Sequence, residues 1–290
     1  MQPKRHRRAP ALRRLLRSPK GYLLRYLFLL ALIALPGEPA ARAGLGILTA
    51  TAAAVAVDLA IERLRNRRRI VPDGAAITAL LCALIISPHA HWYLGPAAAA
   101  IAIVSKHLIR VRWGQRTIHV LNPAATGLLA TLVLFPAGQS WWGALTNRPT
   151  IWSLALIAIG ATVDRHVAKL PQALAFLATY FGVFTTIAFA TMGGGVISLA
   201  GRLSDVYRPP FVNAALFFTF FMLTDPPTSP NREAEQLRFG ALAGVAAAVA
   251  YLTLHTLAFL PAGLLAANLT LAWRRRQQRH APAPVCPAHT

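Results

Sequence analysis

Apolar stretches recur along almost the whole chain, and this repetition restricts its fold more than any other feature. A helix needs about 20 apolar residues to cross a bilayer, where all its backbone groups must be hydrogen-bonded internally. Of the 290 residues, 56% are hydrophobic and 13% charged, about half the charged share of an average soluble domain. We therefore predict an all-α, polytopic membrane protein. Its ten expected transmembrane segments are 21–36, 44–62, 74–87, 92–107, 122–136, 151–164, 171–191, 210–224, 239–257 and 258–273.

Basic residues predict how these segments are oriented. Cytoplasmic loops of membrane proteins carry an excess of Lys and Arg. Ten crossings with both termini in the cytoplasm would place nearly all basic residues on that side, which predicts a multi-pass protein of the bacterial inner membrane. We expect a basic cytoplasmic segment at 1–20, one transmembrane domain at 21–273 and a cytoplasmic tail at 274–290. The six basic blocks are 1–25, 63–72, 105–117, 165–170, 225–238 and 274–290.

Two other interpretations of the basic residues need to be considered. A net charge of +21 could indicate nucleic-acid binding. Because the charge lies in short blocks between apolar segments, we expect the lipid bilayer as a partner and no nucleic acid. The basic start, the apolar stretch after it and "ARA" at 41–43 also imitate a secretory signal peptide, so processing of the N-terminal segment stays open.

A comparison of the chain with itself indicates an internal repeat. The two copies of the repeat are displaced from each other by five segments. Because five is odd, the second copy would be inserted upside down, as in many transporters. The expected repeats cover about 21–136 and 151–273. A shift of 138 residues aligns three pairs of prolines: Pro72 with Pro210, Pro88 with Pro226, and Pro123 with Pro261.

The third and eighth segments are equivalent in this repeat, and both are short and bracketed by prolines. About 14 helical residues at 1.5 Å each extend about 21 Å, which is too short for a bilayer core of about 30 Å. Paired short segments in matching positions are typical of a binding site near the middle of the membrane. Two ordinary short helices joined by turns are the alternative.

Three stretches carry a resemblance to a known family: "PDGAAITALLCALIISP" (72–88), "SKHLIRVRWGQRTIHVLNPAATGLL" (105–129) and "FFMLTDPPTSP" (220–230). The chain resembles NqrB of the sodium-pumping NADH:quinone oxidoreductase and RnfD of the Rnf complex. That family has Asp-Gly near the third helix, Lys before a Gly-rich turn, Asn-Pro-Ala opening the fifth helix and Thr-Asp-Pro closing the eighth. All four elements occur here in order.

The resemblance implies flavin chemistry. NqrB and RnfD carry FMN esterified to a threonine of a Ser-Gly-Ala-Thr motif in the outer loop after the fifth helix. Here that loop, "AGQSWWGALTNRPT" (137–150), lacks the motif, and "IGAT" (159–162) lies inside the sixth segment. Covalent FMN is therefore not expected, and Thr162 is interpreted as an ordinary helix residue.

The resemblance also implies a non-covalent flavin, riboflavin or FMN, near the Asn-Pro-Ala turn. Asn122 is retained, His119 stands where the family often has asparagine, and Gly114 alone remains of the Gly-rich turn. The expected cofactor-binding residues are Asp73, Lys106, His119, Asn122, Pro123, Thr224, Asp225 and Thr228.

Each of these residues also has a structural interpretation. Asn122 and Pro123 are favourable as the cap and first residue of a helix. Asp73 and Asp225 could cap the turns that they begin, and Lys106 could extend to the membrane interface instead of neutralising a flavin or lipid phosphate. The threonines could satisfy backbone carbonyls left free by the short segment.

Other chemistry is less well supported by the sequence. Asp58 and Glu62 lie four residues apart on one helix face, where they could serve cation passage or pair with nearby basic residues. Cys82 and Cys286 form neither a disulfide framework nor a metal set, and we predict no metal site and no catalytic residue.

The sequence thus predicts an inner-membrane subunit of an electron transport system. It would bind flavin non-covalently, pass electrons with partner subunits or flavoproteins, and have no enzymatic activity on its own. A permease or channel for a small solute or ion is the alternative, because paired interrupted helices suit transport equally well. A membrane scaffold with a degenerate site, or a relative similar to the UnbU-like proteins, also stays open.

Overall fold

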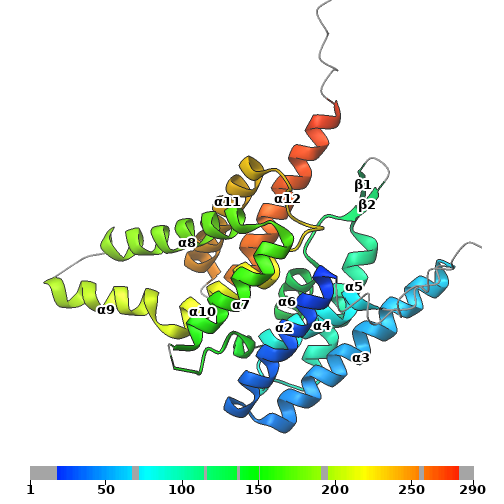
Figure 1. Ribbon diagram of the computed structural model, residues 1–290, viewed down its shortest axis with the longest axis horizontal. Helices are drawn as coiled ribbons and strands as arrows, with labels where there is room; N and C mark the ends of the chain where they lie inside the picture. The colour runs from blue at the N-terminus through cyan, green and yellow to red at the C-terminus, as the bar shows by residue number, and fades with distance from the viewer. Residues whose placement is uncertain are drawn as a thin grey trace, which may run out of the picture.

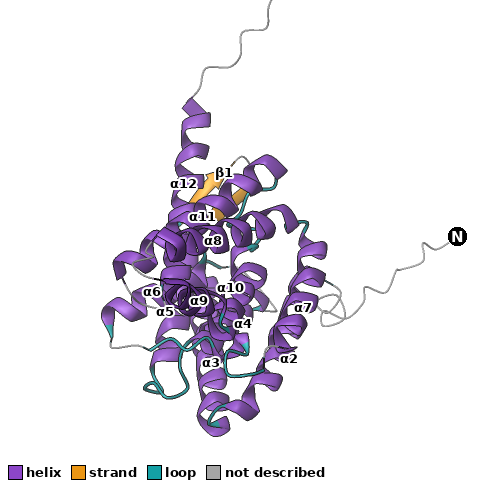
Figure 2. Ribbon diagram, turned by 90° about the vertical axis from the view of Figure 1, so that its left-hand side faces the viewer, coloured by secondary structure: helices purple, strands orange, loops and turns teal. Residues whose placement is uncertain are grey.

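The structure, a computed structural model, describes residues 18–66, 72–113, 116–135, 138–149, 151–190, 195–254 and 258–280. Helices dominate this part of the chain, and its one sheet is a two-stranded hairpin (Figure 1, Figure 2). The helices of the first half are α2 (Pro19–Ala34), α3 (Ala40–Leu64), α4 (Asp73–Ile85), α5 (Leu94–Leu108) and α6 (Pro123–Leu134). Those of the second half are α7 (Ile151–Val167), α8 (Leu170–Ala190), α9 (Gly195–Tyr207), α10 (Pro209–Phe218), α11 (Glu233–Leu254) and α12 (Phe259–His280).

Each of the ten predicted segments coincides with one of these helices. The helix α9 coincides with none of the predicted segments. The helices α4, α5 and α6 are apolar but shorter than a full span. The protein is therefore an all-α polytopic membrane protein, as predicted, while the number of crossings stays a prediction. Five stretches are long and apolar enough to cross a membrane: Pro19–Gly37, Ala40–Leu64, Leu170–Ala190, Gly201–Leu223 and Glu233–Thr253.

Besides α9, the sequence did not predict the hairpin of β1 (Arg110–Trp113) and β2 (Arg116–His119). The hairpin follows α5 and lies beside α12 (Figure 1, Figure 2). The end of α9 is held by α8, because the ring of Tyr207 stacks on Phe181 with centroids 5.5 Å apart. Both elements are stabilised by contacts between neighbouring parts of the chain: β1 pairs with β2, and α9 contacts the preceding helix α8.

The short helix α4 ends inside the protein, and the loop after α6 closes the space beyond it. The first turn and last turn of any helix leave backbone groups without intrahelical partners. Here the indole N–H of Trp142 donates to Ala83 O (2.8 Å), and the backbone N–H of Ser140 donates to Ile85 O (2.9 Å). Trp142 is buried within the 3₁₀ turn η2 (Trp142–Ala144). The loop therefore supplies hydrogen-bond donors to the last carbonyls of α4.

The equivalent short helix of the second half, α10, continues into a π-helical turn, η3 (Thr219–Leu223). Its last carbonyls are also satisfied by side chains of other elements. The Asn122 amide donates to Met222 O (3.2 Å), and the Gln172 amide donates to Leu223 O (2.6 Å). Both short helices thus end within the protein with their carbonyls hydrogen-bonded, which irregular backbone at membrane depth requires.

The two halves share a packing pattern. In the first half α5 contacts α3 and α6, and in the second half α11 contacts α8 and α12. A Cβ atom at Gly127 would lie 2.2 Å from Ala98 O, and one at Gly263 would lie 2.7 Å from Ala243 O, so small residues allow both crossings. This agreement supports the predicted five-helix repeats, whose opposite orientation stays a prediction.

Candidate functional site

The helix ends that carry the predicted site residues meet at one end of the bundle. We call it the basic end, because Lys20, Lys106, Arg110, Lys169 and Arg275 lie there. The beginnings of α4 and α6, the ends of α5, η3 and α12, and the hairpin all come together in this region (Figure 1). The structure thus brings together segments that are more than half the chain apart.

Asn122 is committed to contacts within the protein. Its side-chain oxygen accepts from the backbone N–H of Ala125 (3.0 Å), as an N-cap does, and its amide donates to Met222 O. Its own backbone N–H donates to the side-chain oxygen of Asn268 (2.9 Å), whose amide donates in turn to Thr228 O (3.0 Å). Asn122 therefore positions α6, η3 and α12, and Pro123 is the buried first residue of α6.

Asp225 and Thr228 organise the turn that follows η3. The Thr228 hydroxyl donates to Asp225 Oδ2 (3.0 Å), and the Ser229 hydroxyl donates to Asp225 O (2.8 Å). The Thr224 hydroxyl donates to Phe220 O (3.0 Å), so it satisfies a carbonyl of the preceding turn. The capping interpretation of Asp225 thus agrees with the geometry.

His119 faces this turn from β2, with Nε2 4.0 Å from Asp225 Oδ2. Burial, with the nearby charges of Lys106 and Arg110, lowers the pKa of His119 to about 4. Burial raises the pKa of Asp225 to about 6, although a hydrogen bond from Thr228 and nearby lysines act in the opposite direction. At neutral pH the imidazole is therefore uncharged beside an ionised carboxylate.

Lys106 points inward, so the prediction that it could extend to the interface is wrong. Its Nζ lies 3.4 Å from Asp58 Oδ1 and 3.3 Å from the position that a Cβ of Gly74 would occupy. At the start of α4, Asp73 accepts from the backbone N–H of Gly74 (2.8 Å) and pairs with Lys20 Nζ at 3.1 Å. Because Lys106 lies between α3 and α4, it pairs with a carboxylate that is shielded from solvent.

A buried ionic cluster that the sequence indicated only in part lies next to Lys106. Asp58 and Glu62, which the sequence placed on one helix face, both lie close to His107. Nε2 of His107 is 2.7 Å from Asp58 Oδ1, and Nδ1 is 3.9 Å from Glu62 Oε1. Arg110 donates to His107 Nδ1 (2.9 Å). A bond from a guanidinium to Nδ1 leaves the imidazole proton on Nε2, facing Asp58.

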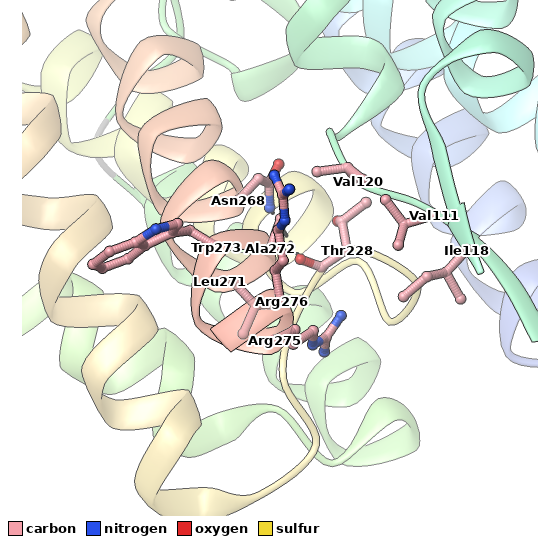
Figure 3. A pocket seen from close by; sticks show the side chains of 10 residues that line it. All are labelled: Val111, Ile118, Val120, Thr228, Asn268, Leu271, Ala272, Trp273, Arg275 and Arg276. Atoms are coloured by element: carbon pink, nitrogen blue, oxygen red, sulfur yellow. Dashed lines mark hydrogen bonds between the residues drawn. The ribbon is translucent and has the colours of Figure 1, made fainter. Parts of the chain in front are cut away.

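A cavity of about 550 Å³ opens between the hairpin and α12 (Figure 3). Alternation along the strands turns Ile118 and Val120 toward it and His119 toward the opposite side, where Asp225 lies. Of the predicted site residues, Thr228 is the one that lines it. The lining residues are Val111, Ile118, Val120, Thr228, Asn268, Leu271, Ala272, Trp273, Arg275 and Arg276.

The sequence prediction missed the contribution of α12 to this cavity. Asn268, Ala272 and Arg276 recur every four residues and therefore share one face of the helix. That spacing, in which polar residues interrupt an apolar helix next to a basic run, was a signal that the prediction did not use.

Comparison with known proteins agrees with the motifs. Residues 26–206 match the model of the NQR2, RnfD, RnfE family. The chain belongs to this family. It is similar to an ion-translocating oxidoreductase complex subunit from Pseudomonas aeruginosa strain LESB58, with 27% identity over 253 residues, 69% of this chain and 72% of the relative. The corresponding protein from Shewanella amazonensis is 26% identical over 266 residues, 69% of this chain and 74% of the relative.

In this member of the NQR2, RnfD, RnfE family, the loop at 138–149, which the sequence predicts as an outer loop, lies largely in the protein interior. Its residues Trp141, Trp142 and Thr146 are buried, and the Thr146 hydroxyl donates to Ser140 O (3.4 Å). The Thr162 hydroxyl of "IGAT" donates to Ile159 O (2.6 Å), as in an ordinary helix. The expectation that FMN is not attached covalently stays a prediction.

Proposed function

We propose that this chain is an integral membrane subunit of an electron transport system, and that it holds a flavin non-covalently at the basic end. Family membership and the names of its relatives support the first part. The observation that carries the second part is the cavity, whose size and mostly apolar lining with a few polar groups are typical of cofactor sites.

The residues around the cavity fit a flavin. The side chains of Val111, Ile118 and Val120 present apolar surface for a planar ring, and Thr228 offers a hydroxyl for a polar ring edge. A flavin would supply the electron-accepting and electron-donating chemistry. Asn122, which the sequence predicted as a ligand, would act by holding Thr228 in place through Asn268.

The charged residues on the other side of β2 would influence the cofactor through their electric field. Lys106 and Arg110 are cations close enough to lower the pKa of His119, and a nearby cation favours a negatively charged form of any group. Lys106 and Arg110 would therefore favour an anionic reduced flavin without contacting it, whereas the carboxylates of Asp73 and Asp225 would act in the opposite direction.

The short helices favour this function over the permease alternative. In transporters, the free carbonyls of interrupted helices coordinate the transported ion. Here the last carbonyls of both short helices accept hydrogen bonds from protein groups: Ala83 and Ile85 in the first half, and Met222 and Leu223 in the second. This arrangement suits a rigid support for a bound cofactor.

Flavin titration of the purified protein tests the proposal. The wild type should retain riboflavin or FMN in detergent, visible as yellow colour, and release it on acid precipitation. Thr228→Val should weaken binding by roughly tenfold or more, because losing a buried hydrogen bond costs about 1–3 kcal/mol. Thr270→Val is the matched control, because its hydroxyl bonds within α12 and does not line the cavity. No flavin affinity in the wild type would refute the proposal and favour the permease.

We further propose that the chain lies in the bacterial inner membrane with both termini in the cytoplasm and works with partner subunits. The distribution of basic residues supports this orientation. Alkaline phosphatase fused after Leu145 should be active, and the same enzyme fused after Ala168 should be inactive. The reverse pattern would exclude this orientation, and purification in the native membrane extract should recover partner subunits.

A further inference from the structure

The hairpin that forms one wall of the cavity is attached to the helices through His107. Arg110 is the first residue of β1, and its guanidinium donates to His107 Nδ1 (2.9 Å). His107 is buried at the end of α5, and its Nε2 lies 2.7 Å from Asp58 Oδ1 on α3. The contacts that run from β1 to α3 therefore use both nitrogens of one imidazole ring.

The position of the cavity wall depends on this attachment at the base of the hairpin. Val111, which follows Arg110, pairs with Ile118 across the two strands, and both residues line the cavity (Figure 3). Val120 also lines it, and its backbone N–H donates to Ile109 O (3.1 Å), next to Arg110. A shift of Arg110 would therefore be transmitted to the apolar wall.

The contact between His107 and Arg110 requires a neutral imidazole. A guanidinium has donors and no acceptor, so Nδ1 must present its lone pair. Protonation of Nδ1 would replace that lone pair with an N–H group and place a positive charge against Arg110. Histidine is the side chain whose charge ordinarily changes between about pH 5 and 8.

Glu62 offers the protonated ring a different partner. Its Oε1 lies 3.9 Å from His107 Nδ1, the same nitrogen that Arg110 contacts. An imidazolium would donate from Nε2 to Asp58 and from Nδ1 to Glu62, so two carboxylates of α3 would hold the charged ring. The ring thus has two alternative sets of partners, and only the neutral set includes the hairpin.

The other charges around the ring oppose its protonation. Arg65, at the end of α3, donates to His107 O (3.2 Å), and its Nη1 lies 3.5 Å from Nδ1. Lys106 on α5 lies 3.4 Å from the nearer carboxylate of α3, and His119 on β2 is close enough for the charge of His107 to act on it. Because carboxylates and cations both face the ring, a change of pH can shift it between its two sets of partners.

We propose that His107 is a pH-sensitive latch on the cavity. The neutral ring holds Arg110 and with it the hairpin, whereas the protonated ring turns to Glu62, releases Arg110 and loosens the wall. His107 is thus a positioning residue, because it acts through the hairpin. A flavin would bind less tightly as the pH falls, by up to about tenfold per pH unit for one proton. Only this consequence for the flavin rests on the proposed function.

Two substitutions separate the roles of the two ring nitrogens. In His107→Asn the side-chain oxygen replaces Nδ1 as an acceptor for Arg110, and it does not titrate. In His107→Gln the amide replaces the Nε2 donor to Asp58, and the acceptor at the Nδ1 position is lost. A third variant, Glu62→Gln, keeps His107 and removes a negative charge that favours its protonation, so the hairpin should be released at lower pH than in the wild type.

A nitroxide on Val111→Cys measures hairpin mobility by electron paramagnetic resonance, because Val111 is partly exposed on β1. The full-length protein carries Cys82→Ala and Cys286→Ser and is studied in detergent without flavin. With His107 present, the label should be immobile at pH 7.5 and mobile at pH 5.5. His107→Asn should stay immobile at both values, and His107→Gln should be mobile at both.

Two results would overturn the latch. One is a label that is equally immobile at both pH values with His107 present. The other is a response in His107→Asn equal to that of the wild type, which would assign the effect to Asp225 or His119 instead.

Flavin titration of the unlabelled protein tests the consequence for the cavity. Between pH 7.5 and 5.5 the affinity of the wild type should fall about ten- to a hundredfold, and His107→Asn should lose this dependence. Absence of flavin binding at both pH values would refute the proposed function but not the latch, which the label decides. A hairpin that responds to pH while flavin affinity stays constant would refute the coupling of the latch to the cavity.

Discussion

Replacing Trp142 by phenylalanine tests whether the outer loop completes the short helix α4. The indole N–H of Trp142 donates to Ala83 O at 2.8 Å, and both residues are buried. In an uninterrupted helix Ala83 O would accept from Ser87, but the Ser87 N–H donates to Gly138 O instead. Trp142→Phe keeps an aromatic ring and removes this donor, so Ala83 O is left without its hydrogen bond.

The expected cost follows from that single bond. Leaving a buried acceptor unsatisfied costs about 1–3 kcal/mol. The smaller ring also loses packing, so a matched control is required. Trp141→Phe supplies it, because Trp141 is equally buried, packs edge-on against Phe217 and Phe218, and its indole makes no hydrogen bond among the described residues. The difference between the two variants isolates the hydrogen bond.

Cys82 offers a direct assay, because it is a fully buried residue of α4 next to Ala83. In a Cys286→Ser background, a thiol-reactive dye reports how often α4 becomes accessible in detergent. A change of 1–3 kcal/mol corresponds to roughly five- to 150-fold faster labelling when opening precedes reaction. Trp142→Phe should show this acceleration relative to Trp141→Phe. Equal labelling rates in the two variants would refute the role of the loop.

Two further predictions concern packing and pH. Gly127→Ala should destabilise the protein by about 1–3 kcal/mol, because its Cβ would collide with α5, whereas Gly182→Ala, where the space is open, should be neutral or stabilising in a detergent melt. His119→Gln should gain stability relative to Asp225→Asn as the pH falls from 7 to about 4. The His119→Gln variant retains Asp225, whose folded-state pKa of about 6 exceeds its ordinary value. As the pH falls, Asp225 is therefore protonated in the folded state before it is protonated in the unfolded state, which stabilises the folded state. Asp225→Asn should lose stability relative to His119→Gln over the same range, because it retains His119, whose folded-state pKa of about 4 lies below its ordinary value. Parallel pH profiles in both variants would contradict this reasoning.

Several features of this protein were determined by the sequence alone, because they depend on residues close together in the chain. Apolar length predicted the helices, since burial in lipid requires a continuous run of suitable side chains. Prolines at 72, 88, 210 and 226 marked the two short helices, since proline acts on its own backbone and that of its neighbours. The blocks of basic residues likewise predicted a common end, and Lys20, Lys106 and Lys169 lie at the basic end.

The function of individual side chains was decided only by the tertiary structure. The sequence allowed Asn122 to be a helix cap or a ligand. In the structure its side-chain amide also donates a hydrogen bond to Met222 O, 100 residues away in the chain. The cavity needs the hairpin and α12, which are separated by almost the whole second half of the chain. No local pattern encodes such contacts, because each depends on how remote segments pack and on which carbonyls the short helices leave to be satisfied. For the same reason, the sequence did not show that Lys106 pairs with Asp58, a buried carboxylate on α3.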